Sequence, residues 1–172
     1  MVVEARPIGP NRYREVGGRS YEDFVEGDVY EHRPGRTISE ADNTWFCLLT
    51  MNQHPLHFDA AYAAKSEFGR PVVVSSLTLA MVVGMSVTDT SQKAIANLGW
   101  KEIKLTHPVF AGHTLSSQSE VVDKRESRSR PEAGLVSVRT RGFNQDKVLV
   151  CEFDRTMLVS KRGLGVEDKA GY

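Results

Sequence analysis

The chain has 172 residues, of which 40% are hydrophobic and 26% are charged, so it is long and apolar enough for one globular domain. Its 22 Lys and Arg residues balance its 22 Asp and Glu residues, which excludes the basic field typical of nucleic-acid binding. No apolar run approaches the length of about 20 residues that crosses a bilayer. Cys47 and Cys151 lie in apolar segments without CxxC spacing, which predicts reduced thiols in a cytoplasmic protein.

The two ends of the chain differ in character from the middle. Residues 1–20 are rich in Pro, Gly and Arg and lack the apolar core of a signal peptide, so they are predicted to be a polar lead-in. Residues 162–172 are similarly loose and are predicted to be a flexible tail. The folded domain is therefore expected over residues 21–161.

The first predicted elements are a strand and a helix. The stretch "GDVYEHRPGRTIS" predicts a short strand that ends near Pro34 and Gly35. Ser39 and Asp42 have the spacing of a capping box, which predicts that a helix begins there. Apolar residues at helical intervals continue this helix: Trp45, Leu48 and Leu49.

Two further helices are predicted before residue 90. Pro55 disfavours helical geometry at His54, so the first helix should stop before it. The stretch "DAAYAAKSEFG" predicts a second helix, with Asp59 as N-cap and Gly69 as the stop. The stretch "PVVVSSLTLAMVVGMSV" is apolar almost all round, and its length favours a buried helix over a strand.

After residue 93 the pattern changes to strands. Four stretches alternate with period two between Pro, Gly and Asn turns: "AIANLGWKEIKL", "HTLSSQSEVVDKRES", "GLVSVRTRGFNQ" and "KVLVCEFDRTMLVS". A helix that is apolar on every side must be wrapped, and a long curved antiparallel sheet is the available wrapper. The predicted class is α+β, with the pattern of a hotdog fold.

The run Asn52-Gln53-His54-Pro55-Leu56-His57-Phe58-Asp59 resembles the Asp-x-Asn-Pro-aliphatic-His signature of the MaoC-like (R)-specific enoyl-CoA hydratases. "HPVFAGHTL" resembles the Pro-Val-Phe-x-Gly-Asp strand entry of that family, and "FGRPVVVSS" resembles the lead into its central helix. Three longer stretches look most like the mesaconyl-CoA and itaconyl-CoA hydratase (β-methylmalyl-CoA dehydratase) branch: "GRTISEADNTWFCLLTMN", "SVTDTSQKAIANLGW" and "SEVVDKRESRSRPEAGLVSVRTRGFNQ". The resemblance covers residues 21–161.

This sequence departs from the family pattern in the signature itself. Asn52 stands where the family has Asp, His113 replaces the Asp after Gly112, and "VVVSS" replaces Ala-His-Gly. Hydration of a conjugated double bond needs a base for the water and an acid for the α-carbon. An amide can orient water but cannot donate a proton as an acid at neutral pH.

Three residues of the signature are candidates for the site. The resemblance implies that His57 is the general base, a role that suits histidine near neutrality; the alternative is a histidine that only packs in a loop. Asn52 is expected to position water or substrate, or else to be a helix C-cap. His54 could supply the missing proton transfer, or could be an exposed loop residue or a partner of His57.

The remaining candidates would bind the substrate. Ser75 and Ser76 stand where the buried helix should begin, so free N–H groups there could hold the thioester oxygen, although the serines could simply cap the helix. Gly84 could permit close approach of the acyl chain or could be a packing glycine. Arg36 is a candidate partner for the distal carboxylate of a dicarboxylic substrate. Basic residues in "DKRESRSRPE" could bind coenzyme A phosphates or form a solvated turn.

The resemblance implies reversible hydration of a short branched, dicarboxylic enoyl-CoA by a homodimer or a homo-oligomer of dimers, with no nucleic acid or membrane partner. No cofactor is expected beyond the coenzyme A of the substrate, and no metal-ligand spacing or nucleotide loop is present in the sequence. Two alternatives remain. One is a non-catalytic acyl-CoA-binding subunit of a heteromeric hydratase, and the other is an acyl-CoA thioesterase, which would need a carboxylate on the central helix.

Overall fold

The computed structural model describes residues 4–171, and its body is a five-stranded antiparallel sheet. The strand order is β3-β5-β6-β7-β4, so β3 and β4 form the two edges. The four strands predicted after residue 93 are confirmed, because they match β4 to β7 closely. The bounds are Val29–Thr37 for β3, Ala94–Leu105 for β4, Thr114–Glu126 for β5, Ala133–Phe143 for β6 and Leu149–Ser160 for β7.

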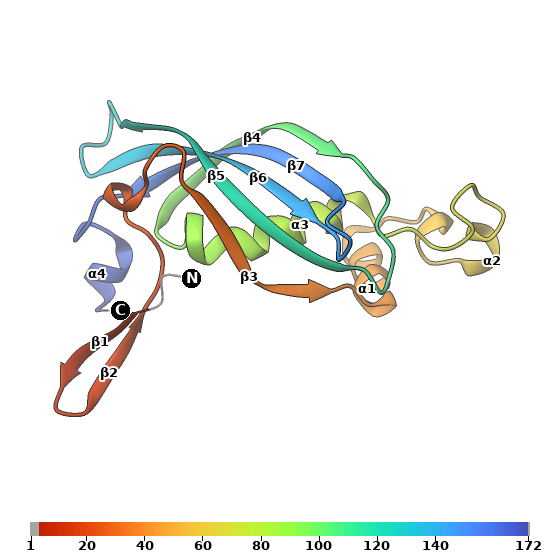
Figure 1. The fold of residues 1–172 in the computed structure, drawn as a ribbon, viewed down its shortest axis with the longest axis horizontal. Helices are drawn as coiled ribbons and strands as arrows, with labels where there is room; N and C mark the ends of the chain where they lie inside the picture. The colour runs from red at the N-terminus through yellow and green to blue at the C-terminus, as the bar shows by residue number, and fades with distance from the viewer. Residues whose placement is uncertain (1–3, 172) are drawn as a thin grey trace.

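A central helix lies along one face of this sheet (Figure 1). α3 spans Ser75–Ser86, continues as a π-helical segment over Val87–Ser91, and packs against β3, β5, β6 and β7. The approach to β6 is close, because a Cβ atom on Gly142 would come 2.5 Å from Val82 Cγ2. The predicted central helix and the α+β hotdog architecture are therefore confirmed, and the helix buries the face that packs on the sheet.

β3 continues past the point at which the sequence predicted it to end. Pro34 and Gly35 lie inside the strand, and the pairing with β5 shifts register between His32 and Arg36. The prediction was wrong because β3 is an edge strand, where a proline without an N–H group costs no hydrogen bond of the sheet. The irregularity absorbs both residues without ending the pairing.

α1 spans Glu40–Thr50 and begins with the predicted capping box. Ser39 Oγ accepts from the Asp42 N–H at 3.1 Å, and the Asp42 carboxylate accepts from the Ser39 N–H at 2.8 Å. The helix ends at Met51 in the left-handed conformation, so Met51 and not Asn52 is the C-cap. The apolar residues that indicated this helix lie outside the core: Trp45, Leu48 and Leu49 are 64%, 67% and 79% exposed.

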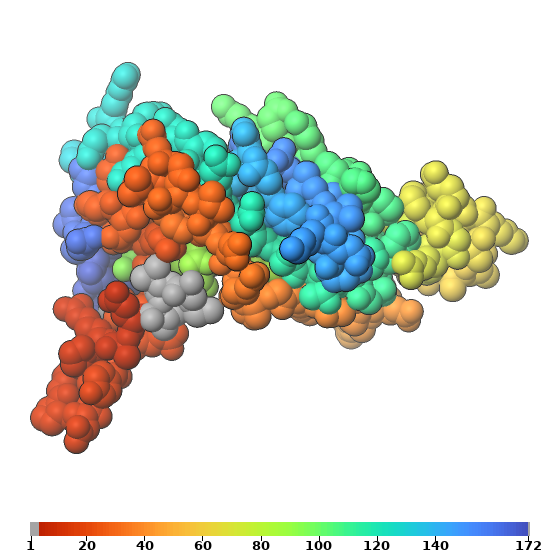
Figure 2. Space-filling model, viewed as in Figure 1, coloured from red at the N-terminus to blue at the C-terminus, as the bar shows by residue number. Residues whose placement is uncertain are grey.

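The second predicted helix is only one turn long. α2 spans Ala60–Ala63, and Asp59 caps it as predicted by accepting from the Tyr62 N–H at 3.0 Å. Turns follow as far as Gly69, which has a φ of 67°. Because almost all of this segment is exposed, helix propensity has no apolar face to support it. Residues 58–70 form the yellow protrusion at one end of the molecule in Figure 2.

The ends of the chain carry structure that the sequence did not indicate. Within the predicted lead-in, β1 (Glu4–Gly9) and β2 (Arg12–Val16) form an antiparallel hairpin that projects from the body (Figures 1 and 2). Within the predicted tail, α4 spans Val166–Ala170. Residues 1–3 and 172 lie outside the described range. None of the helices within residues 4–171 has both the length and the hydropathy required to cross a membrane.

A buried polar cluster fixes the C-terminal end of the central helix to the sheet. His32 is fully buried, with Nδ1 2.9 Å from Asp89 Oδ2 and Nε2 2.8 Å from Ser119 Oγ. Arg19 also donates to the Asp89 carboxylate, at 3.2 Å. Arg155 donates to the hydroxyls of the π-helical segment and the last turn of α3, and burial lowers its pKa to about 10. Burial likewise lowers the pKa of His32 although Asp89 favours the charged imidazole.

Candidate functional site

The predicted signature lies in the segment between α1 and α3. His54 has extended backbone geometry (φ −70°, ψ 116°), as expected before a proline, and Pro55 opens a single 3-10 turn over Pro55–His57. His54 therefore precedes this turn and His57 is its last residue, so neither extends α1. Their ring centroids lie 5.6 Å apart.

The orientation of His57 is fixed by a main-chain acceptor. Its Nδ1 lies 2.8 Å from the carbonyl oxygen of Val72. Because a carbonyl only accepts, Nδ1 must carry the hydrogen, which leaves the lone pair of the neutral imidazole on Nε2. The half-buried ring thus has the tautomer that a general base requires.

His54 has the opposite tautomer. Its Nδ1 accepts from the backbone N–H of Leu56 at 3.1 Å, so in the neutral ring the hydrogen is on Nε2. The ring is also edge-on to Tyr62, with centroids 6.1 Å apart. The two histidines of the segment therefore offer one Nε2 acceptor and one Nε2–H donor.

Asn43 supports this geometry and was not recognised in the sequence. The side chain is buried on α1; its Nδ2 donates to the His57 carbonyl at 2.8 Å and to the Val72 carbonyl at 3.2 Å. Its Oδ1 accepts from the Val74 N–H at 2.9 Å. One amide of α1 thus bonds the main chain of His57 and also Val72, whose carbonyl accepts from the His57 ring. The available signal was its position four residues before the buried Cys47, where an apolar residue would be expected.

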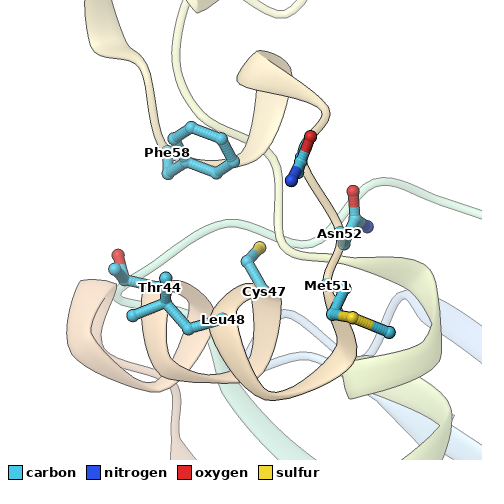
Figure 3. A pocket seen from close by; sticks show the side chains of 7 residues that line it. Thr44, Cys47, Leu48, Met51, Asn52 and Phe58 are labelled. Atoms are coloured by element: carbon cyan, nitrogen blue, oxygen red, sulfur yellow. The ribbon is translucent and has the colours of Figure 1, made fainter.

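Asn52 follows α1 and lines a cavity of about 370 Å³ between this helix and Phe58. In Figure 3, Cys47 and Phe58 face this space from its two sides, with Asn52 at the end of the helix. Its Oδ1 accepts from the His54 N–H at 3.1 Å. The amide NH₂ group forms no hydrogen bond within residues 4–171, so it can donate to a molecule in the cavity.

Ser75 and Ser76 are the first two residues of α3, and both are exposed. The N-cap is Val74 and not either serine. The N–H groups of the first turn have no acceptor inside a helix, and the helix dipole adds a partial positive charge there. Gly84 lies farther along α3 on an exposed surface, where an added Cβ would meet none of the described atoms within 4 Å. Packing inside this chain therefore does not require glycine there.

Two other positions have specific neighbours. Arg36 is 62% exposed at its side chain and donates to Asp42 Oδ1 at 2.5 Å, so its charge is already paired. His113 packs edge-on to Phe110, with centroids 5.5 Å apart, and its Nδ1 is buried without a partner in the described chain. Burial, and then the positive charge of Arg70, lower the pKa of His113. Within residues 4–171, no three His, Cys, Asp or Glu side chains gather as a metal site would require.

Comparison with known proteins agrees with this geometry. A family model described as mesaconyl-CoA hydratase matches residues 11–171. The mesaconyl-CoA hydratase of Cereibacter sphaeroides is 34% identical over 145 residues, which is 84% of this chain and 42% of that relative. A structure from Chloroflexus aurantiacus, described as a MaoC domain protein dehydratase, aligns with a TM-score of 0.81 at 33% identity over 86% of this chain and 42% of that one.

A protein of Mycobacterium tuberculosis described as a double hotdog fold aligns with a TM-score of 0.78 over 84% of this chain and 45% of its own. At 24% identity this likeness concerns the fold. The chain spans less than half the length of these three relatives. By the family model and by relatives at about one-third identity, the chain belongs to the mesaconyl-CoA hydratase family of MaoC-like hotdog hydratases and dehydratases.

Proposed function

We propose that the protein catalyses the reversible hydration of a short branched enoyl-CoA thioester with a second carboxylate, such as mesaconyl-CoA or itaconyl-CoA. The observation that carries this proposal is the hydrogen bond from His57 Nδ1 to the Val72 carbonyl at 2.8 Å. It leaves Nε2 of His57 free to take a proton from water. The similarity to mesaconyl-CoA hydratases supports the substrate class.

In the hydration direction, His57 Nε2 takes one proton from water while the water oxygen bonds to the β-carbon. The π electrons move toward the thioester oxygen, which becomes enolate-like. The imidazolium of His57 then gives its proton to the α-carbon, so one ring serves as base and then as acid. These steps need no carboxylate at position 52, because His57 serves as both base and acid. The free amide of Asn52 and the Nε2–H of His54 orient the water.

The first turn of α3 stabilises the negative oxygen. The N–H groups of Ser75 and Ser76 lie at the start of the helix that follows the segment bonded to His57. Donors that meet an oxyanion are worth about 3–4 kcal/mol of barrier in acyl-transfer enzymes. In this proposal the thioester carbonyl binds at this helix end and the double bond faces His57.

A second copy of the chain completes the binding crevice in this proposal. Five apolar residues of the edge strand β4 are at least 40% exposed: Ile95, Leu98, Trp100, Ile103 and Leu105. Ser76, Ala80 and Gly84 also make one exposed face of α3. Relatives of which this chain covers less than half, one of them described as a double hotdog fold, support a pair of hotdog units. The acyl-CoA tunnel then runs along the boundary between two copies.

One alternative is a non-catalytic acyl-CoA-binding subunit. Asn52 is the feature that supports it, because an amide cannot take the place of the family's Asp as an acid. A thioesterase is less favoured, because α3 has no acidic residue over Ser75–Ser86 and Asp89 of the π-helical continuation is buried against His32. One assay separates the three functions. A hydratase removes the absorbance of the conjugated thioester without releasing free thiol, a thioesterase releases thiol, and a binding subunit does neither.

The test of the mechanism is the His57→Ala variant. Turnover of mesaconyl-CoA should fall by about 10²- to 10⁴-fold, the usual contribution of positioned proton transfer. Thermal melting should match the wild type within a few degrees, because the ring is half-buried and bonded through one nitrogen. Full activity in a folded His57→Ala protein would contradict the proposed role.

A further inference from the structure

We propose that Arg70 binds the distal carboxylate of the acyl group and thereby selects dicarboxylic over monocarboxylic enoyl-CoA substrates. This inference rests on the function proposed above. Arg70 belongs to the segment that holds His57, because Val72, two residues later, supplies the acceptor for His57 Nδ1. Two residues of fully extended chain span at most about 7 Å.

The position of the guanidinium is fixed by an aromatic stack. Its Cζ lies 4.0 Å from the centroid of the Phe110 ring. Phe110 is itself edge-on to Phe68 at 6.5 Å and to His113 at 5.5 Å. The backbone reinforces this arrangement, since the Val73 N–H donates to the Val109 carbonyl at 2.8 Å. A stacked guanidinium keeps its N–H edge available for a bidentate carboxylate.

The charge of Arg70 is not neutralised within the described chain. Its guanidinium forms no ion pair or hydrogen bond with residues 4–171, whereas Arg36 is paired with Asp42 at 2.5 Å. Burial, and then the charge of Arg70, favour the neutral form of the neighbouring His113, because both lower its pKa. An Asp at position 113 would instead place a competing carboxylate near Arg70.

The chemistry of the substrate puts its distal carboxylate close to the base. In mesaconyl-CoA the distal carboxylate is bonded directly to the β-carbon that water attacks. A group that binds it must therefore lie beside the base, and Arg70 is on the segment that carries the acceptor for His57. The phosphates of coenzyme A are separated from the thioester by the whole pantetheine arm, so they do not fit a cation beside the base.

The experiment compares mesaconyl-CoA with tiglyl-CoA, in which a methyl group replaces the distal carboxylate. Arg70→Gln should lower kcat/KM for mesaconyl-CoA by about 10- to 100-fold, as expected for loss of a charge-assisted hydrogen bond. Its kcat/KM for tiglyl-CoA should change by less than about twofold. His113→Asp, which keeps Arg70 but adds a carboxylate, should produce a loss of the same selectivity. Lys65→Gln removes one positive charge from the same protrusion and should change neither value.

Three results would overturn the assignment. Equal losses for both CoA thioesters, absent with the N-acetylcysteamine thioesters, would make Arg70 a phosphate ligand. Loss of selectivity in Arg36→Gln but not in Arg70→Gln would give the carboxylate to Arg36. If neither variant loses selectivity, another group binds the distal carboxylate.

Wild-type turnover separately tests the proposed function. If the wild type hydrates neither substrate, calorimetric binding of the same two thioesters decides the role of Arg70. A preference for mesaconyl-CoA that disappears in Arg70→Gln supports the assignment. No wild-type preference, or a preference that survives in Arg70→Gln, overturns it.

Discussion

Main-chain hydrogen bonds decide which ring nitrogen of each loop histidine carries the hydrogen. The Val72 carbonyl accepts from Nδ1–H of His57, and the Leu56 N–H donates to the lone pair on Nδ1 of His54. Neither assignment depends on a titratable neighbour. The chemical difference between two nearby imidazoles thus comes from the local fold around Pro55.

Asn52 should affect turnover more than stability. Asn52→Ala removes the free amide donor and the acceptor of the His54 N–H, so kcat should fall by about 10-fold or more. Asn52→Asp keeps an acceptor and adds a titratable group, so it should retain activity with a shifted pH optimum. The measurement is kcat against pH for both variants with thermal melts. Wild-type turnover in Asn52→Ala would remove Asn52 from the site.

Asn43 should affect stability and turnover together. Asn43→Ala leaves the His57 and Val72 carbonyls and the Val74 N–H without this partner, so unfolding free energy should fall by about 1–3 kcal/mol. Turnover should also fall because the segment that holds His57 loosens. Urea denaturation and kcat check this, with the exposed Leu49→Ala on the same helix as the control. A folded, fully active Asn43→Ala protein of wild-type stability would contradict it.

Among the helices and strands, the sequence predicted the ones that owe their pattern of residues to burial or to a local hydrogen bond. β5 to β7 alternate because each buries one face, and Ser39 and Asp42 cap α1 through contacts three residues apart. β3 continues past Pro34 because it lies at the edge of the sheet, and this position is defined only once the sheet is assembled. The helix after Asp59 was predicted too long for a related reason. It is exposed, so no tertiary contact extends its single turn.

The residues of the candidate site also fall into those that the local sequence marks and those that only long-range contacts define. The loop histidines could be identified because a proline and a motif mark them locally. The role of Asn43 could not, because its three partners lie 14 to 31 residues away in the chain. Likewise, nothing local indicates that Phe110 fixes Arg70, since the two residues meet only in the folded protein.

The polar cluster between the central helix and the sheet should make stability depend on pH. The pKa of His32 is lowered by burial, so below about pH 6.5 the unfolded chain binds a proton that the folded chain does not. Unfolding free energy therefore falls as pH decreases below 6.5, by up to about 1.4 kcal/mol per pH unit for one such group. Arg19 and Arg155 act on His32 in the same direction as burial, while Asp89 opposes them.

Urea denaturation between about pH 5 and pH 7.5 measures this slope. His32→Gln should flatten it, even if the variant is less stable throughout. His113 also has a lowered pKa, so His113→Gln should remove a separate part of the slope. A slope unchanged in His32→Gln would show that another group is responsible.

At the level of the whole molecule, the exposed edge strand should govern assembly. Trp100 and Ile103 on β4 are each 44% exposed, and a long apolar edge is rarely left uncovered. We expect a dimer in sedimentation equilibrium. Ile103→Lys should shift it toward monomer and lower kcat, while Val122→Lys on β5 should do neither. A fully active wild-type monomer would exclude a site completed by a second copy.

The carbonyl of Val72 has one consequence for the evolution and redesign of the protein. Because the acceptor for His57 belongs to the main chain, no substitution at position 72 deletes it. If Arg70 selects the acyl group as proposed, side chains along residues 70–74 can change that selection while the hydrogen bond that orients His57 is kept. Substrate range and acid–base chemistry can vary independently, although they are encoded within the same few residues.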